Sequence, residues 1–261
     1  MSAHPTLHIK DITAGYPGKP DVLSRLAAAP FAPGGVYALI GPNAAGKTTL
    51  LRCIAGLLPG RGEILFGNEN LLHLSLKRRA AMISYMPQHL PEDVDLIVIE
   101  SLIGALKASP FDQVSAKLNT VKKKAFDLLE QMDIAALALE PLNQLSGGQK
   151  QLVSLAQSII RQPLALLLDE PTSALDLQHQ VAVMKLARAY AQKGNIVIMV
   201  LHDINLATRW ADEIAVLHKG KIAAQGRPDA ILTPQLLENV YEVNAAVESF
   251  SNGVIQISVI E

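Results

Sequence analysis

The sequence has little cysteine, almost no excess charge and no long hydrophobic run. Its 261 residues include one cysteine, Cys53, which excludes an internal disulfide and fits a reducing compartment. The formal net charge is −1, so the chain has no basic footprint for nucleic acid. Apolar runs such as residues 164–168 and 196–201 are strand-sized, whereas crossing a bilayer takes about 18 apolar residues.

The N-terminus also lacks the pattern of a secretion signal. Residues 1–10 do not place a charged region before an apolar one. Together with the missing membrane spans, this predicts a soluble, cytoplasmic protein that would reach a membrane only through a partner. The length and a hydrophobic content of 49% suit one large α/β domain with buried strands.

Strand and helix patterns alternate along most of the chain. Helical patterns cover residues 48–58, 177–193 and 204–211. Strand patterns cover residues 7–13, 36–40, 63–66, 164–168, 195–201, 214–217, 222–225 and 254–260. This alternation is typical of a mostly parallel sheet with helices on its faces.

One stretch departs from this alternation and has only helical periodicity. It contains helical patterns at residues 97–108, 114–132 and 146–161, with a break at residues 109–110 and Ser146 suited to cap the third helix. We therefore predict a single domain, 1–261, with a helical subdomain inserted in it. Residues 1–87 and 163–261 would form the α/β core with a β subdomain, and residues 88–162 the helical subdomain.

A phosphate-binding loop follows the apolar strand at residues 36–40. It matches Gly-x-x-x-x-Gly-Lys-Ser/Thr and leads into a helix, the context that supports this motif. Backbone amides and the helix end make an anion site there, to which Lys47 adds charge and Thr48 a hydroxyl for Mg²⁺. Ala44 stands where glycine is usual, so the loop must accommodate a Cβ. The predicted nucleotide contacts are Gly41, Pro42, Asn43, Ala44, Ala45, Gly46, Lys47, Thr48 and Thr49.

Polar side chains also follow other predicted strands. Asp169 and Glu170 come after the apolar run 164–168, and open parallel sheets bind ligands at that edge. We expect Asp169 to hold Mg²⁺ through water and Glu170 to orient the attacking water. His202 and Gln88, which also follow strands, are weak signals alone. Beside the other motifs, His202 is expected at the γ-phosphate and Gln88 at Mg²⁺ or the attacking water.

Two further features concern the ends of the nucleotide. Tyr16, in a turn-rich stretch, could stack on adenine, although packing on its own loop is an equally good interpretation. The segment 145–149, Leu-Ser-Gly-Gly-Gln, is small, polar and at a helix start. It has no evident role in its own subunit. The Ser146 hydroxyl and the amides of Gly147 and Gly148 suit a γ-phosphate held by a second copy.

With these motifs in this order, the chain resembles the ATP-binding subunits of ABC transporters over nearly its whole length. The resemblance implies a P-loop NTPase (RecA-like) fold, ATPase activity, and ATP and Mg²⁺ as cofactors. It puts Tyr16 at the adenine-stacking position and Asp176 in the D-loop. It implies catalytic roles for Glu170, His202, Gln88 and Lys47, metal roles for Thr48, Gln88 and Asp169, and contacts to the partner's ATP from Ser146, Gly147, Gly148, Gln149 and Asp176.

Within that family, the chain is most similar to importers of iron chelates (siderophores), haem and vitamin B12. Residues 175–180, 201–207, 231–234 and 240–243 carry this resemblance, while Ala105 and Gln157 stand where that class usually has arginine. Molybdate or another oxyanion therefore stays open as cargo. The alternative functional classes are a soluble ABC ATPase and the ATPase subunit of an exporter. The implied partners are a second copy, a membrane permease and, indirectly, a substrate-binding protein, at the cytoplasmic face of the cell membrane.

Overall fold

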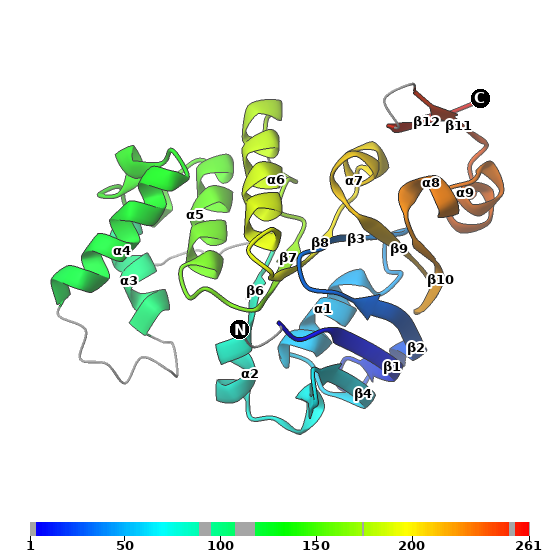
Figure 1. Ribbon diagram of the computed structural model, residues 1–261, viewed down its shortest axis with the longest axis horizontal. Coiled ribbons are helices and arrows are strands. Elements are labelled where there is room, and N and C mark those ends of the chain that lie inside the picture. Colours follow the sequence, from blue (N-terminus) through cyan, green and yellow to red (C-terminus); the bar gives the residue numbers. More distant parts are fainter. Residues whose placement is uncertain (1–3, 89–94, 108–117, 174, 251–253, 261) are drawn as a thin grey trace.

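A central mixed sheet organises the fold, as the sequence predicts (Figure 1). The computed structural model describes residues 4–88, 95–107, 118–173, 175–250 and 254–260. The strand order is β10-β9-β3-β8-β7-β6, parallel from β9 to β6, with β10 antiparallel at the edge. The strands are β3 (Val36–Ile40), β6 (Ile83–Met86), β7 (Ala165–Asp169), β8 (Ile196–Val200), β9 (Glu213–His218) and β10 (Lys221–Gly226).

A second, antiparallel sheet packs over helix α1 (Lys47–Ala55), which lies between the two sheets (Figure 1). Its order is β2-β1-β4-β5, from β1 (Leu7–Gly15), β2 (Asp21–Phe31), β4 (Gly60–Phe66) and β5 (Glu69–Asn70). The sequence did not predict β2. Its buried residues Leu23, Leu26 and Phe31 are three and five residues apart, because bulges interrupt the pairing of β2 with β1. The sequence of β2 therefore lacks the alternation of apolar and polar residues that identifies a strand.

The helical stretch between β6 and β7 contains α3 (Val98–Lys107), α4 (Leu118–Gln131) and α5 (Gly147–Ile159). These agree with the three predicted helices, and Ser146 caps α5 as expected. The predicted break at residues 109–110 and the predicted start of the second helix lie outside the described residues. Short 3₁₀ turns, η2 (Ala135–Leu137) and η3 (Leu142–Gln144), connect α4 to α5.

The remaining elements complete the layers around the central sheet. Predicted helices 177–193 and 204–211 are α6 (Leu177–Ala191) and α7 (Ile204–Trp210), and the predicted tail strand is β12 (Ile255–Val259). Asn205 of α7 holds β12 through two hydrogen bonds with the Ile257 backbone, of 2.7 and 3.1 Å. Besides β2, β5, η2 and η3, the unpredicted elements are η1 (Leu71–His73), α2 (Leu76–Met82), α8 (Pro228–Ile231), α9 (Pro234–Tyr241) and β11 (Ala245–Ser249).

Alternate residues of the central strands pack into two separate hydrophobic cores. In β3, Val36, Ala38 and Ile40 face the helical side, where α6 and α7 lie against the strand, whereas Tyr37 and Leu39 face α1 and the antiparallel sheet. The strands β7 and β8 divide in the same way, as the period of two requires. Because both faces are covered, these strands are continuous apolar runs, which made them easy to predict.

The helix after the phosphate loop is shorter than predicted. We expected it to extend to residue 58, but α1 ends at Ala55. Gly56 adopts a left-handed conformation (φ 81°), and its N–H bonds to the carbonyl oxygens of Arg52 and Cys53, which closes the helix. In the part of the chain that the structure describes, no helix is long and apolar enough to cross a membrane.

A buried hydroxyl ties α6 to the start of β7 and provides a test of this packing. The Tyr190 hydroxyl donates to the Pro163 carbonyl oxygen at 2.6 Å. We expect Tyr190→Phe to lower the free energy of unfolding by about 1–1.5 kcal/mol, because that carbonyl loses its donor. Urea denaturation would measure the loss, with an unchanged slope against denaturant. An unchanged midpoint would contradict this account of the α6–β7 contact.

Candidate active site

The carboxyl ends of four parallel strands bring the predicted polar residues to one edge of the sheet. The phosphate loop follows β3, Gln88 follows β6, Asp169 and Glu170 stand at the end of β7, and His202 follows β8. Parallel strands end on the same side of a sheet, and that side is where such sheets bind ligands. The four segments, far apart in sequence, thus form one cluster.

The phosphate loop is closely packed against its surroundings. A Cβ at Gly41 (φ 143°) would lie 2.1 Å from the Leu217 carbonyl oxygen, and one at Gly46 (φ 109°) 2.6 Å from a methyl of Leu23. Both positions therefore require glycine. Ala44 takes the left-handed conformation (φ 61°) in place of the usual glycine, at a cost of about 1–2 kcal/mol.

The ammonium of Lys47 contacts its own loop. It donates to the carbonyl oxygens of Gly41 at 2.7 Å and Pro42 at 2.9 Å, and the residue is 6% exposed. Burial lowers the pKa of Lys47, while the nearby carboxylates of Glu170 and Asp169 raise it. This buried charge, with the backbone amides around it, is suited to bind phosphate oxygens.

Asp169 is buried and held by two hydroxyl groups. Thr48 donates to its Oδ1 at 3.0 Å and Tyr85 to its Oδ2 at 2.9 Å. Burial raises the pKa of Asp169, and the two hydrogen bonds oppose the rise. The oxygens of Asp169 and Thr48 are the ligand type that Mg²⁺ prefers, so this pair fits a magnesium site.

Tyr85 is itself oriented by Arg52 of α1. The Arg52 Nε donates to the Tyr85 hydroxyl oxygen at 3.3 Å, which leaves the Tyr85 proton for Asp169. Burial raises the pKa of Tyr85 to about 12, so the hydroxyl stays a donor at neutral pH. The same guanidinium donates to the Tyr16 hydroxyl at 3.4 Å. Tyr16 is half-buried against the core, and its stacking on adenine stays a prediction.

The carboxylate of Glu170 joins the loops after β6 and β8. Its Oε2 accepts a hydrogen bond from Gln88 Nε2 at 2.6 Å, and its Oε1 lies 2.5 Å from His202 Nε2. The Glu170 backbone has φ 53°, a left-handed conformation that costs a non-glycine residue about 1–3 kcal/mol. Such strain is typical of functional positions.

The segment 145–149 lies at the N-terminus of α5 and is stabilised by its own side chains. Gln149 N–H donates to Ser146 Oγ at 3.3 Å, and Ser146 N–H donates to Gln149 Oε1 at 2.9 Å, a capping box. Among the described residues, no hydrogen bond or ion pair joins Ser146–Gln149 to the phosphate loop. Asp176 caps α6 by accepting from the His179 N–H at 2.9 Å, and Ala174 before it lies outside the described residues.

Three residues of this cluster were missed by the sequence analysis. Arg52 and Tyr85 have been described above, and Gln151 donates to the Glu170 carbonyl oxygen at 2.9 Å. Their positions gave a weak signal, because Tyr85 comes three residues before Gln88 and Gln151 two residues after Gln149. Nothing local in the sequence indicates which distant partner such a side chain contacts.

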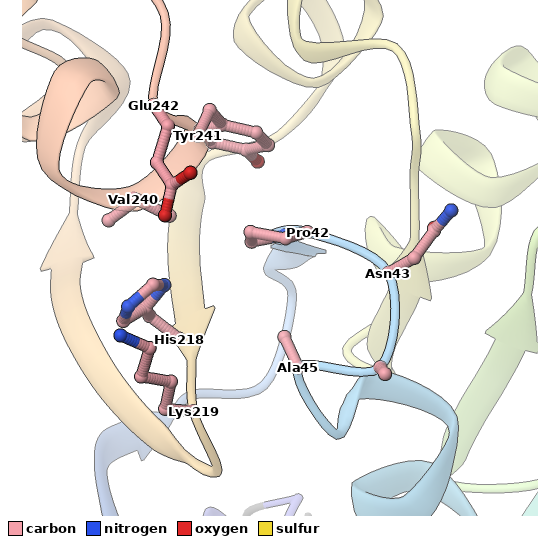
Figure 2. Close-up of a pocket in the computed structure, with 9 residues that line it drawn as sticks. Pro42, Asn43, Ala45, His218, Lys219, Val240, Tyr241 and Glu242 are labelled. Carbon is pink, nitrogen blue, oxygen red and sulfur yellow. The ribbon is translucent and has the colours of Figure 1, made fainter.

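A cavity of about 340 Å³ adjoins the outer side of the phosphate loop (Figure 2). Tyr241 and Glu242 at the end of α9 face Pro42 and Ala45 across it, with His218 and Lys219 on a third side. Burial raises the pKa of Tyr241, and a hydrogen bond from the Gly41 backbone opposes the rise. Lys47, Asp169 and Glu170 do not line this cavity, so it adjoins the polar cluster and is not its centre.

Solved structures share this architecture. A dimeric ATP-binding cassette in a post-hydrolysis state, bound to ADP and phosphate, aligns with a TM-score of 0.77 and 26% identity, over 85% of this chain and 98% of that one. A metal-chelate type ABC transporter in an inward-facing conformation has the same fold, with a TM-score of 0.81 and 22% identity over 98% of both chains. The fold and the strand-edge cluster define a P-loop NTPase of the ATP-binding cassette class.

Sequence comparison narrows this class to a family. The ABC transporter family model matches residues 28–173. The hemin import ATP-binding protein HmuV of Bordetella pertussis is 35% identical over 252 residues, covering 93% of this chain and 94% of the relative. HmuV of Thermobifida fusca is 36% identical over 217 residues, covering 83% and 75%. The chain belongs to the ABC transporter family, as an ATP-binding subunit.

The raised pKa of Asp169 predicts how stability responds to its removal. A folded pKa above the unfolded value means that stability is lost as pH rises through the folded pKa. Asp169→Asn should therefore raise the melting temperature without nucleotide at pH 7, because the variant has no charge for burial to disfavour. Thermal melts between pH 4 and 8 would show the gain shrinking toward pH 4.

Asp212→Asn is a matched control of opposite sign. The Asp212 carboxylate accepts from the Val36 N–H at 2.7 Å and pairs with Arg188, so its loss should lower the melting temperature. A lower melting temperature for Asp169→Asn at pH 7 would contradict the view that burying the charged Asp169 carboxylate lowers the stability of the fold.

Proposed function

We propose that the chain is the ATP-hydrolysing subunit of an importer for haem or another iron chelate. One observation carries the hydrolytic part. The Glu170 carboxylate is held between Gln88 and His202 at the sheet edge that also carries the phosphate loop. A carboxylate beside a phosphate site can accept a hydrogen bond from water and direct it at the γ-phosphate.

Each polar group has a distinct part in this chemistry. The loop amides and Lys47 would bind the β- and γ-phosphates, and His202 would contact the γ-phosphate as well as Glu170. Thr48, Asp169 and Gln88 would hold Mg²⁺. When bound, this ion neutralises part of the negative charge of the phosphates. Tyr16 would cover the adenine.

The second part of the proposal is a homodimer that encloses two ATP molecules. Ser146 and Gly147 are exposed at the N-terminus of α5, where the helix dipole favours an anion. Together with Gly148, Gln149 and Asp176 they would contact the γ-phosphate side of ATP held by the other copy. Hydrolysis would remove this bridge, so ATP favours the closed dimer and its loss favours the open one.

Closure would move the helical subdomain, residues 88–162, relative to the α/β core of residues 1–87 and 163–261. Gln88 stands at the entrance of that subdomain and already contacts Glu170. We propose that this subdomain docks on a membrane permease, which would hold the chain at the cytoplasmic face of the membrane. A substrate-binding protein would deliver cargo to the permease from the other side.

The choice of cargo rests on the relatives. The HmuV proteins of Bordetella pertussis and Thermobifida fusca are named for hemin import, and the chain matches the first over nearly its full length. We therefore propose haem as cargo, with iron-siderophore, vitamin B12 and molybdate as the alternatives to be tested beside it.

Replacing Glu170 tests the hydrolytic and transport parts together. In vesicles containing the permease, we expect the parent protein to hydrolyse ATP and to take up haem, and Glu170→Gln to lose both by a factor of about 100 or more. Glu170→Gln should still bind ATP and form a stable dimer, because its amide keeps the shape of the side chain. Unchanged ATP turnover would contradict the proposed role of Glu170 in hydrolysis. Uptake of molybdate in place of haem would contradict the assignment of haem as cargo.

Mixing defective chains tests the dimer. A chain with Lys47→Ala has a defective phosphate loop, and a chain with Ser146→Arg has a defective helix N-terminus. Each alone should be inactive. A mixed dimer should regain about one working site, because one Lys47 and one Ser146 then meet across the interface. ATPase assays at a series of mixing ratios would measure the recovery, and its absence would count against contacts between copies.

A further inference from the structure

The backbone of Glu170 is held by a side chain from α5, the helix that carries residues 145–149 at its start. Gln151 Nε2 donates to the Glu170 carbonyl oxygen at 2.9 Å. Gln151 is 7% exposed, so this amide is removed from solvent and its hydrogen bond is protected from competing water. The contact is direct and joins the helical stretch to the end of β7.

The Glu170 peptide needs such support. The residue is left-handed (φ 53°) and precedes Pro171, and residues before proline favour extended conformations. Its carbonyl oxygen also accepts from Ser173 Oγ at 3.1 Å and Ser173 N–H at 3.3 Å, but those donors belong to the same loop. Gln151, in contrast, reaches this carbonyl oxygen from a separate element, α5.

The position of Gln151 within α5 matters as much as its hydrogen bond. Ser146 and Gln151 are five residues apart, a separation of about 7–8 Å along a helix. The exposed end of α5 and the support of Glu170 are therefore parts of one rigid unit. A shift of α5 at its N-terminus would be passed to the Glu170 peptide within two helical turns.

We infer that Gln151 is a positioning residue that makes the orientation of Glu170 depend on the placement of α5. The inference rests on the proposed function, because in the proposed dimer the start of α5 contacts ATP bound to the other copy. Gln151 then links the two ATP sites through a single chain. The carboxylate of one site is correctly placed only when the helix that closes the other site is in position.

Gln151→Met tests the role of the donor, because methionine has a similar length and no N–H. We expect kcat for ATP to fall about tenfold, since a small displacement of a catalytic group has effects of this size or larger. The dissociation constant for ATP should stay within about twofold of the parent. Gln151→Asn, whose amide is one methylene too short to reach, should behave in the same way and serves if the first variant does not fold.

Gln225→Met is the matched control for loss of a glutamine–backbone hydrogen bond. Gln225 bonds to the N–H and C=O of Ala29, at 2.8 and 3.2 Å, between β10 and β2. It should keep the parent kcat. An unchanged kcat in Gln151→Met, or an equal loss of ATP binding and turnover, would overturn the inference. An inactive parent protein would instead overturn the proposed function.

Mixed dimers separate positioning of Glu170 from general damage to α5. One chain carries Glu170→Gln, so only the carboxylate of the other chain is used, together with α5 of the first. Gln151→Met placed in the chain with the intact Glu170 should lower turnover about tenfold relative to the same mixed dimer without it. Gln151→Met placed in the chain with Glu170→Gln should leave turnover close to that of the mixed dimer without Gln151→Met. Equal losses from both placements would show a structural role for Gln151 and overturn the inference.

Discussion

The parallel pairing of β3, β8, β7 and β6 is the constraint on which the whole site depends. The registers place Leu39 beside Val200 and Asp169 beside Val200, so the strands end almost level at one edge. The residues that follow each strand therefore lie close together at this edge of the sheet. A one-residue slip in any pair would turn the buried side chains of that strand to the wrong face and carry its polar terminus away from the others.

This edge is stable only because the layers on both sides of the sheet hold it. Ala44 and Glu170 are left-handed, and Asp169 is a carboxylate that is 1% exposed. Each is unfavourable by itself, and the two cores that the alternating strand residues create hold the strands from which these segments extend. Concentrating strain where phosphate and water would bind is the usual relation between stability and activity.

The sequence predicted most of the fold and nearly all of the polar cluster, for a physical reason. Buried parallel strands are continuous apolar runs, and the residues that follow them must meet at one edge. It failed where structure depends on distant contacts. The bulged β2 lost its period of two, and the partners of Tyr85 and Gln151 lie 84 and 19 residues away in sequence. The early end of α1 at Ala55 is a separate failure with a local cause, the left-handed Gly56 that follows it.

Among the described residues, no hydrogen bond or ion pair joins the start of α5 to the phosphate loop of its own chain. Its capping box satisfies the amide of Gln149 and the amide of Ser146, while Gly147 stays exposed at the positive end of the helix. A glycine there leaves no side chain between the helix end and an approaching anion. Gln151 in the next turn already holds Glu170. In the proposed dimer, an anion bound at this end would therefore act on a carboxylate that serves a different nucleotide. Two such chains facing each other would therefore control one another's catalytic groups without any additional element.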